Sequence, residues 1–510
     1  YRTKRPGEAG ERFLDPNTLS EDGTVALAAA SFSKDGRYLA YAAAASGSDW
    51  VEIRVVDTAT GTLTEDRIEW VKNSGATWSP DSKGFYYSAY DAPEKSVYSD
   101  QNQFQKVYYH ELGTPQSSDR LVYEDKNHPL RYFWAWPSED GKWLFVCASE
   151  GTSGTEVLYR KTSEKNFRTL LPGFDADYGV VTVENDRLYY VTNRDASNYT
   201  LRRIDLNRPA KDEVVIPENA KNLLEGVGTA GGYLFAAYLQ DAQSRIAQYD
   251  FEGKLVREVA LPAIGSVSGF GGEKEDKEIY YSRTNYTAPA TIYRYDIATG
   301  ESTLYKAPEV RFDPSLFTTE QVFYPSKDGT QVPMFITRRK DMKRDGKNPC
   351  LLYAYGGFQI NQTPKFKPSE LMFVEQGGIY CVANLRGGSE YGEEWHKAGM
   401  LENKQNVFDD FIAAGEYLVR NKYTSSRKLA ISGGSNGGLL VGACMTQRPD
   451  LFAVAFPQVG VLDMLRYHLF TVGWGWVVEY GSSDDPEQFE YIYKYSPLHN
   501  IKEGVCYPAT

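Results

Sequence analysis

Polar turns and short apolar strands alternate along the first 300 residues of the chain. A turn with Asp, Asn or Gly leads into a strand rich in Tyr, Phe, Leu and Val, and a second strand then ends in another turn. This phrase recurs roughly every 45 residues, apart from one insertion at 90–104, and such a period is typical of propeller blades. Its starts are Asp35, Asp81, Asp140, Asn185, Gly231 and Asp276.

Each repeat predicts one small antiparallel sheet that can bury its faces only against neighbouring repeats. The partner strands at 51–61 and 291–300 end in matching Thr-Gly turns in the first and last repeats. Six repeats are visible, and residues 1–30 resemble the tail of another. The pattern therefore predicts a β-propeller of about seven blades, the first incomplete. A sandwich array and an open solenoid are the alternatives, because a period alone does not establish closure.

The periodicity changes around Pro308 and Pro314. A hairpin is expected at 321–339, with its turn at 327–329, and strands then alternate with helices. Alternation of this kind predicts an α/β domain with a mostly parallel sheet, so the expected domains are a propeller at 1–308 and an α/β-hydrolase domain at 309–510. The expected strands are 350–355, 378–385, 428–432 and 451–459, with an amphipathic helix at 406–420.

The strand at 428–432 runs directly into the sequence GGSNG at 433–437 and then into a helix-compatible run. G-x-S-x-G between a strand and a helix is typical of a nucleophile elbow, which makes Ser435 the expected nucleophile. Glycines are expected beside it, since so tight a turn leaves no room for a Cβ on its neighbours. The alternative is a phosphate loop, but a P-loop would end in Gly-Lys-Ser/Thr and a dinucleotide loop would have Gly at position 435.

An activated serine also needs oxyanion donors and a base. The backbone N–H of Asn436 is one expected donor, and either the Tyr355 hydroxyl or an amide of its loop is the other. Only His468, in a segment that reads as an amphipathic helix, and His499, in a loop, follow Ser435. Structural roles are expected for both, so the aspartate and histidine of the triad are expected beyond Thr510.

Composition narrows the classes of function. Lys and Arg number 56 against 68 Asp and Glu, a net charge of −12 without a basic run, so no nucleic-acid partner is expected. No apolar run approaches the roughly 18 residues of a membrane span. No metal or other cofactor is expected. The five cysteines are scattered and read as buried thiols of a reducing compartment, so a cytoplasmic location is expected. A monomer is also expected. The chain begins with Tyr, which leaves a targeting signal, and a periplasmic or secreted location, open.

Six stretches together resemble the prolyl oligopeptidase family of serine peptidases, and the resemblance covers essentially the whole chain. They are FYPSKDGT at 323–330, YGGF at 355–358, ANLRGGSEYGEEWHKAGM at 383–400, NKQNVFDDF at 403–411, GGSNGGLL at 433–440 and YSPLHNIK at 495–502. The resemblance implies a seven-bladed propeller that caps an α/β-hydrolase domain, and cleavage of short peptides on the carboxyl side of proline. It implies that Ser435 is the nucleophile and that the Asn436 amide and the Tyr355 hydroxyl form the oxyanion hole.

The same resemblance implies a proline pocket lined by Phe358, Val461, Trp476 and Tyr480. Stacking on an indole in an apolar slot is a sensible way to recognise an uncharged ring. The family's aspartate, histidine and substrate-holding arginine, and an N-terminal segment, fall outside these 510 residues. The hydrolase domain is therefore expected to be truncated before its acid and base.

Other functions stay open at this point. Relatives with the same architecture include an acylaminoacyl peptidase, a dipeptidyl peptidase and an oligopeptidase that cuts after Arg or Lys. A basic-residue cutter should carry acidic residues in its primary pocket, and Trp476 and Phe358 argue against that. A propeller interaction scaffold with an inactive hydrolase domain is the alternative from another class. In the peptidase reading, the propeller is expected to admit substrates by size.

Overall fold

The computed structural model describes residues 1–3, 8–94, 96–97, 100–261 and 264–510. They form two compact units. The first consists of Tyr1–Leu188, Asp205–Ala210 and Leu469–Gly475. The second consists of Tyr189–Ile204, Lys211–His468 and Trp476–Thr510.

The repeats form antiparallel sheets of strands that follow one another along the chain. The first two repeats are joined in one eight-stranded sheet, where Val71 pairs with Ala89. Its strands are β1 (Val25–Phe32), β2 (Tyr38–Ala45), β3 (Trp50–Asp57), β4 (Thr62–Lys72), β5 (Thr77–Trp78), β6 (Gly84–Ala89), β7 (Lys106–Glu111) and β8 (Arg120–Tyr123).

Four four-stranded sheets follow. The first two contain β9 (Tyr132–Pro137), β10 (Trp143–Ser149), β11 (Glu156–Lys161) and β12 (Arg168–Leu171), then β13 (Tyr178–Glu184), β14 (Arg187–Thr192), β15 (Thr200–Asp205) and β16 (Asp212–Ile216). The last two contain β17 (Leu223–Ala230), β18 (Tyr233–Gln240), β19 (Gln243–Tyr249) and β20 (Leu255–Glu258), then β21 (Ser266–Ser268), β22 (Glu278–Asn285), β23 (Ala288–Asp296) and β24 (Ser302–Lys306).

The recurring polar turn is held by its own side chains in the first three repeats. In each, a serine hydroxyl donates to an aspartate two residues later, and the same aspartate accepts the backbone N–H two residues further on. Such an Asx turn competes with continued strand and so reverses the chain. The pairs are Ser33 with Asp35, Ser79 with Asp81 and Ser138 with Asp140.

The prediction of sheet-forming repeats is confirmed, and the described residues contain six four-stranded units. Residues 25–30, expected in the tail of another blade, lie in β1 of the first complete unit. Before β1 the described residues form η1 (Pro16–Thr18) and a bridge between Arg2 and Glu11, so a seventh blade stays a prediction. The predicted insertion lies between β6 and β7, and its residues 95 and 98–99 lie outside the described part.

A six-stranded mixed sheet follows the repeats, in the order β25-β26-β28-β27-β29-β30. The two pairings of β26 are antiparallel and the last three pairings are parallel, as the alternating pattern predicts. The strands are β25 (Phe317–Pro325), β26 (Gln331–Arg339), β27 (Cys350–Tyr353), β28 (Ile379–Ala383), β29 (Leu429–Gly434) and β30 (Val454–Gln458). The α-helices are α1 (Pro368–Glu375), α2 (Glu393–Lys397), α3 (Gln405–Arg420), α4 (Asn436–Gln447), α5 (Val477–Tyr480) and α6 (Pro486–Tyr495). The 3₁₀ turns beyond η1 are η2 (Gln116–Ser118), η3 (Pro314–Leu316), η4 (Leu401–Asn403), η5 (Tyr467–Leu469), η6 (Gly473–Trp476) and η7 (Pro497–Asn500).

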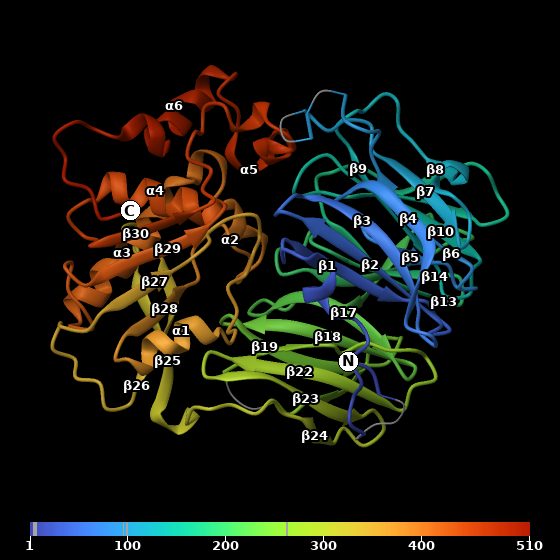
Figure 1. The fold of residues 1–510 in the computed structure, drawn as a ribbon, viewed down its shortest axis with the longest axis horizontal. Coiled ribbons are helices and arrows are strands. Elements are labelled where there is room, and N and C mark those ends of the chain that lie inside the picture. Colours follow the sequence, from blue (N-terminus) through green and yellow to red (C-terminus); the bar gives the residue numbers. More distant parts are fainter. Residues whose placement is uncertain (4–7, 95, 98–99, 262–263) are drawn as a thin grey trace. The chain divides into compact units, whose positions relative to one another are not determined.

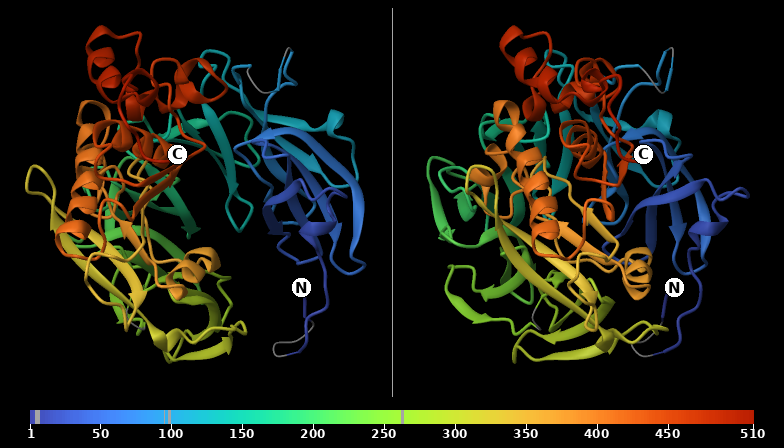
Figure 2. Two further views of the ribbon diagram at one scale, coloured as in Figure 1. Left: turned by 60° about the vertical axis from the view of Figure 1, so that its left-hand side comes forward. Right: turned by 90° about the vertical axis from the view of Figure 1, so that its left-hand side faces the viewer.

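Alternate side chains of this sheet enter two different hydrophobic clusters, because strand side chains point to opposite faces. On β28, Cys381 joins the cluster that contains α3 and α4 residues, whereas Tyr380 and Val382 join the cluster that contains α1 residues. The sheet is therefore covered by α3 and α4 on one face and by α1 on the other, which Figures 1 and 2 let the reader follow. No helix in the described part of the chain is long and apolar enough to cross a membrane.

The amphipathic helix expected around His468 is wrong, because only the single turn η5 forms. The chain leaves the second unit after His468, and Trp474 then stacks on Tyr132 in the first unit with ring centroids 5.2 Å apart. The expected boundary at residue 308 does not divide the compact units, since Ala242 and Tyr286 share a buried cluster with β26 and β28. That boundary stays a prediction.

Candidate active site

Ser435 stands alone between the end of β29 and the start of α4. Its φ of 58° and ψ of −116° lie in a region that L-residues rarely adopt, and strain of this kind is typical of functional turns. The Ser435 amide donates to the carbonyl of Gln458 at 2.9 Å. Its side chain is exposed, as the nucleophile-elbow prediction requires.

Most of the glycines around Ser435 are required by close backbone packing. A Cβ on Gly433 would lie 2.4 Å from the Gly437 carbonyl oxygen, and one on Gly438 would lie 2.5 Å from the Cα of Gly460. The expectation that both sequence neighbours lack room is wrong at Gly434, where the nearest atom to such a Cβ is 3.9 Å away. The backbone therefore leaves no space for a side chain where the turn packs against α4, but it leaves space for one at position 434.

Asn436 ties the elbow to the loop that follows β27. α4 begins at this residue, so its amide belongs to the first turn, where N–H groups have no partner within the helix. The buried side chain donates from Nδ2 to the Tyr355 carbonyl at 2.6 Å, and its Oδ1 accepts from the Tyr480 hydroxyl at 2.8 Å. The side chain thus fixes the Tyr355 loop against the start of the helix.

The Tyr355 side chain lies beside Ser435. Burial raises the pKa of the Tyr355 hydroxyl, and a side-chain hydrogen bond with Ser435 partly opposes that rise. The hydroxyl therefore stays protonated and able to donate at neutral pH. The structure brings together the two side chains that the sequence placed at the reaction centre.

The four residues expected in a proline pocket pack on one cluster. Phe358, Val461 and Trp476 are half-buried against the cluster that contains Tyr480. The Phe358 and Tyr480 rings meet edge to face at 5.3 Å, and Trp476 stacks on Tyr467 at 6.1 Å. Tyr480 itself is 0% exposed. Three of the four residues therefore offer surface, and Tyr480 supports them from behind.

Neither downstream histidine contacts the serine. His468 pairs through Nε2 with Asp484 at 3.2 Å, and His499 lies 2.8 Å from the Ser496 hydroxyl in the turn η7. Within the described residues, no histidine is hydrogen-bonded to Ser435. The structural roles expected for both histidines stay a prediction.

Sequence reasoning missed three charged residues next to the Tyr355 loop: Lys404, Glu479 and His396, each 1% exposed. Burial lowers the pKa of Lys404 to about 8, against the opposing effect of Glu479. Burial also disfavours protonated His396, but the hydrogen bonds that its ring donates to Glu393 and Glu479 outweigh this effect and raise the pKa to about 9. The one available signal was an acidic residue inside the apolar run WVVEY at 476–480.

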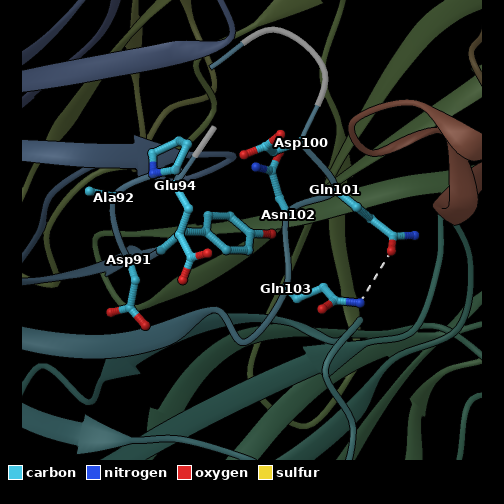
Figure 3. Close-up of a pocket in the computed structure, with 9 residues that line it drawn as sticks. Asp91, Ala92, Glu94, Asp100, Gln101, Asn102 and Gln103 are labelled. Carbon is cyan, nitrogen blue, oxygen red and sulfur yellow. Dashed lines mark hydrogen bonds between the residues drawn. The ribbon is translucent and has the colours of Figure 1, made fainter. Parts of the chain in front are cut away.

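A separate pocket lies in the insertion between β6 and β7 of the first unit (Figure 3). Carboxylates and amides line it, and Gln103 donates to Gln101 at 3.2 Å. The described lining residues are Tyr90, Asp91, Ala92, Pro93, Glu94, Asp100, Gln101, Asn102 and Gln103, without a nucleophile-base pair. Across the described part of the chain, no group of His, Cys, Asp and Glu is arranged to hold a metal ion.

A serine on a strand-to-helix elbow of a mostly parallel sheet, preceded by blade-like antiparallel sheets, defines an α/β-hydrolase joined to a β-propeller. Residues 1–308 match the model of the prolyl oligopeptidase N-terminal β-propeller domain, and residues 364–510 match the model of the prolyl oligopeptidase family. The chain belongs to the prolyl oligopeptidase family.

Similar proteins cover almost the whole chain. A prolyl endopeptidase of Elizabethkingia meningoseptica is 48% identical over 100% of this chain and 72% of its own length. A solved structure from a study of two prolyl endopeptidases has a TM-score of 0.93 at 43% identity, covering 98% of this chain and 74% of the other. Prolyl oligopeptidase B of Galerina marginata, bound to a 25mer macrocyclization substrate, also has a TM-score of 0.93, at 36% identity, over 98% and 72%.

Proposed function

We propose that the chain acts as a serine oligopeptidase that cleaves short peptides on the carboxyl side of proline. The observation that carries this proposal is the exposed, strained Ser435 at the elbow, with the Tyr355 hydroxyl as its neighbour. Membership of the prolyl oligopeptidase family, and relatives named prolyl endopeptidases, support peptide cleavage at proline. The reaction class is acyl transfer through a covalent intermediate.

The described residues supply the nucleophile and the oxyanion donors of the proposed reaction. The Ser435 hydroxyl oxygen attacks the carbonyl carbon of the substrate proline, and its proton passes to a base. The Asn436 amide and the Tyr355 hydroxyl donate to the oxygen that becomes negative, where fixed donors stabilise a transition state strongly. The C–N bond then breaks, the amine leaves with that proton, and water hydrolyses the acyl-enzyme.

The base and its aspartate are proposed to lie beyond Thr510. The contacts of His468 with Asp484 and of His499 with Ser496 support this, since each histidine has another partner. Ala509 already pairs in parallel with Val454 of β30, and the relatives extend further than the matched length. The family order of serine, acid and histidine agrees with this placement.

Phe358, Val461 and Trp476 are proposed to contact the proline ring, with Tyr480 behind them. Their shared packing supports this assignment. Glu479 lies beside this set, but its carboxylate accepts the Phe358 amide and pairs with His396. A carboxylate committed in this way is a poor receptor for an Arg or Lys side chain, which favours an apolar specificity.

The remaining proposals concern the whole chain. The domains are proposed as a propeller at 1–308 and a hydrolase domain at 309–510, because β24 ends at Lys306 and β25 begins the mixed sheet at Phe317. A monomer in the cytoplasm is proposed. The five cysteines are free, although the expectation that all are buried is wrong at the exposed Cys506. The buried Cys350 and Cys381 thiols lie 3.7 Å apart without a disulfide, which supports a reducing compartment.

The test is hydrolysis of a chromogenic Gly-Pro substrate by the full-length protein, with and without a serine-reactive organophosphate. We expect release of the chromophore, its loss after the organophosphate, and a mass increase on the peptide that contains Ser435. Ser435→Ala should fold normally and retain less than about 1% of the wild-type rate, because the nucleophile is lost. Higher activity in a pure preparation of this variant would contradict the assignment, and a Gly-Ala substrate serves as the specificity control.

A further inference from the structure

The loop at 355–359 is strained, and buried side chains hold it. Gly356, Phe358 and Gln359 have φ values of 71°, 57° and 59°. Two of these residues carry side chains, and such conformations persist only where their surroundings fix them. The loop carries both the Tyr355 hydroxyl and the Phe358 ring, so its shape decides where both groups point.

Three buried side chains from three separate parts of the chain each bind one backbone group of the loop. Asn436, at the start of α4, donates to the Tyr355 carbonyl at 2.6 Å. Lys404, just before α3, donates from Nζ to the Gly356 carbonyl at 2.8 Å. Glu479, in α5, accepts the Phe358 amide at Oε1 at 2.9 Å.

These side chains are also bound to one another. Lys404 Nζ donates to Asn436 Oδ1 at 3.1 Å and lies 3.9 Å from Glu479 Oε1. Glu479 Oε2 pairs with His396 Nε2 at 2.7 Å, and Glu393 accepts the side-chain amide of Gln359 at 3.0 Å. Because Glu393 also pairs with His396, the chain of hydrogen bonds that starts at Tyr355 ends at Gln359 of the same loop.

Burying two cations, Lys404 and His396, together with their carboxylates costs desolvation free energy. An apolar replacement of similar shape is often as stable as a buried ion pair, so stability alone does not explain this network. A satisfied buried network does fix one geometry. Its polar atoms converge on the loop that bears two groups of the proposed reaction.

Resting on the proposed function, we propose that Lys404 and Glu479 are positioning residues of the peptidase site. Lys404 holds the Tyr355 side of the loop, so that the Tyr355 hydroxyl meets the oxyanion. Glu479 holds the Phe358 side, so that the ring meets the substrate proline. Neither side chain touches the substrate.

The first test is a double-mutant cycle between Lys404→Met and Tyr355→Phe in the full-length protein. Methionine replaces all of the lysine side chain except its terminal ammonium group, and Glu479 keeps His396 as its partner. We expect Lys404→Met to lower kcat roughly 10- to 100-fold in the wild-type background but less than about 3-fold when Tyr355 is Phe, because the two changes remove the same contribution. The proposal would be overturned if the kcat losses of the two single variants multiplied in the double variant, or if Tyr355→Phe kept the wild-type kcat.

A second measurement needs no activity. Hydrogen exchange over residues 355–362 reads the protection of the Phe358 amide, and Lys404→Met should speed exchange there. The control is Tyr423→Phe, which removes the hydrogen bond from the buried Tyr423 to Glu320 elsewhere in the same unit and should leave exchange at 355–362 unchanged. Unchanged exchange in Lys404→Met would overturn the proposal. If wild-type protein fails to cleave the Gly-Pro substrate, the proposed function fails, while the exchange result still decides whether Lys404 holds the loop.

Glu479 is tested by a conservative rescue. Glu479→Leu removes the acceptor of the Phe358 amide, and it should raise KM for a proline substrate roughly tenfold and reduce the preference for proline over alanine. Glu479→Gln keeps an oxygen at Oε1, and it should recover most of both losses. If the Leu and Gln variants had the same KM and the same preference for proline, the hydrogen bond to Phe358 would not matter, and the role given to Glu479 would be overturned.

Discussion

At the scale of single residues, backbone strain and buried charge occur together around Ser435. Ser435, Phe358 and Gln359 all have positive φ, at a cost of about 1–3 kcal/mol each for such residues. The hydrogen bonds of Asn436 and Glu479 offset part of that cost by fixing the loop. The strain is retained where it orients reacting groups, which makes single substitutions here informative.

Tyr355→Phe should lower kcat by roughly 10²-fold with little change in KM. A donor to the oxyanion acts mainly in the transition state, so its loss affects turnover more than binding. Steady-state kinetics on the Gly-Pro substrate measure both constants. An unchanged kcat would assign the second donor to a backbone amide of the loop.

Trp476→Ala should weaken discrimination between proline and alanine substrates by up to about 1–3 kcal/mol, because one stacked apolar surface is lost. The ratio of kcat/KM values for the two substrates measures it. Trp474→Ala is the matched control, since that indole stacks on Tyr132 and its loss should leave the ratio unchanged. The reverse result would place Trp474 in the pocket.

At the scale of elements, the elbow depends on how closely α4 approaches β30 and the turn. Gly438 packs against Gly460 near the end of β30, and Gly433 packs against Gly437 of α4. A Cβ on Gly434, by contrast, would contact neither α4 nor β30 closely. Close backbone packing therefore requires glycine at 433 and 438 but not at 434, although the sequence alone shows no difference between them.

Gly433→Ala should disrupt the elbow and remove most activity, because its Cβ would meet the Gly437 carbonyl at 2.4 Å. Gly434→Ala should keep the fold and much of the activity, since its Cβ meets nothing closer than 3.9 Å. Melting temperature and Gly-Pro hydrolysis compare the two variants. Equal losses would mean that Gly434 serves substrate access and not packing.

His110 links two neighbouring repeats of the first unit. Its ring lies between Asp66 of β4 at 2.9 Å and Asp119 at 2.7 Å, and it is 0% exposed. Burial disfavours the charged ring, but the hydrogen bonds to Asp119 and Asp66 outweigh it and raise the pKa to about 9. The folded state therefore holds a proton that the unfolded chain releases near pH 6.5, at about the ordinary histidine pKa.

Stability from His110 is complete below about pH 6.5 and is lost as the pH rises through about 9. We expect the wild-type melting temperature to fall across this window, and His110→Gln to start lower and fall less. Thermal unfolding at several pH values measures this, with the exposed His128→Gln as control. Parallel curves for wild type and His110→Gln would contradict a charged His110.

The sequence predicts elements better than contacts, for a physical reason. Period-two strands, Asx turns and the G-x-S-x-G motif are local patterns, so the sheets and the position of Ser435 could be predicted. Lys404 and Glu479 are 75 residues apart, and nothing local shows that both reach one loop. The helix expected around His468 does not form: only the turn η5 (Tyr467–Leu469) is present, and Leu469 and Phe470 are exposed instead of lying on the buried face of a helix.

At the scale of the whole molecule, the strands of the repeats run from Val25 to Lys306 and contain none of the proposed catalytic residues. A domain of that size without chemistry needs another role. The proposed role is to restrict which substrates reach Ser435, as lids and covering domains do in other enzymes.

A proline-containing peptide of about ten residues should therefore be cleaved readily by the full-length protein, and the same sequence displayed on a folded carrier should resist. Access, and not the local sequence, differs between the two substrates. Mass spectrometry of both, with a conventional protease as a control that cuts the displayed site, measures kcat/KM for each. Comparable values would contradict restriction by size, and would leave the repeats with a role outside substrate selection. A large preference for the free peptide that disappears when the displayed loop is lengthened with flexible residues would show that the restriction acts on the bulk of the carrier.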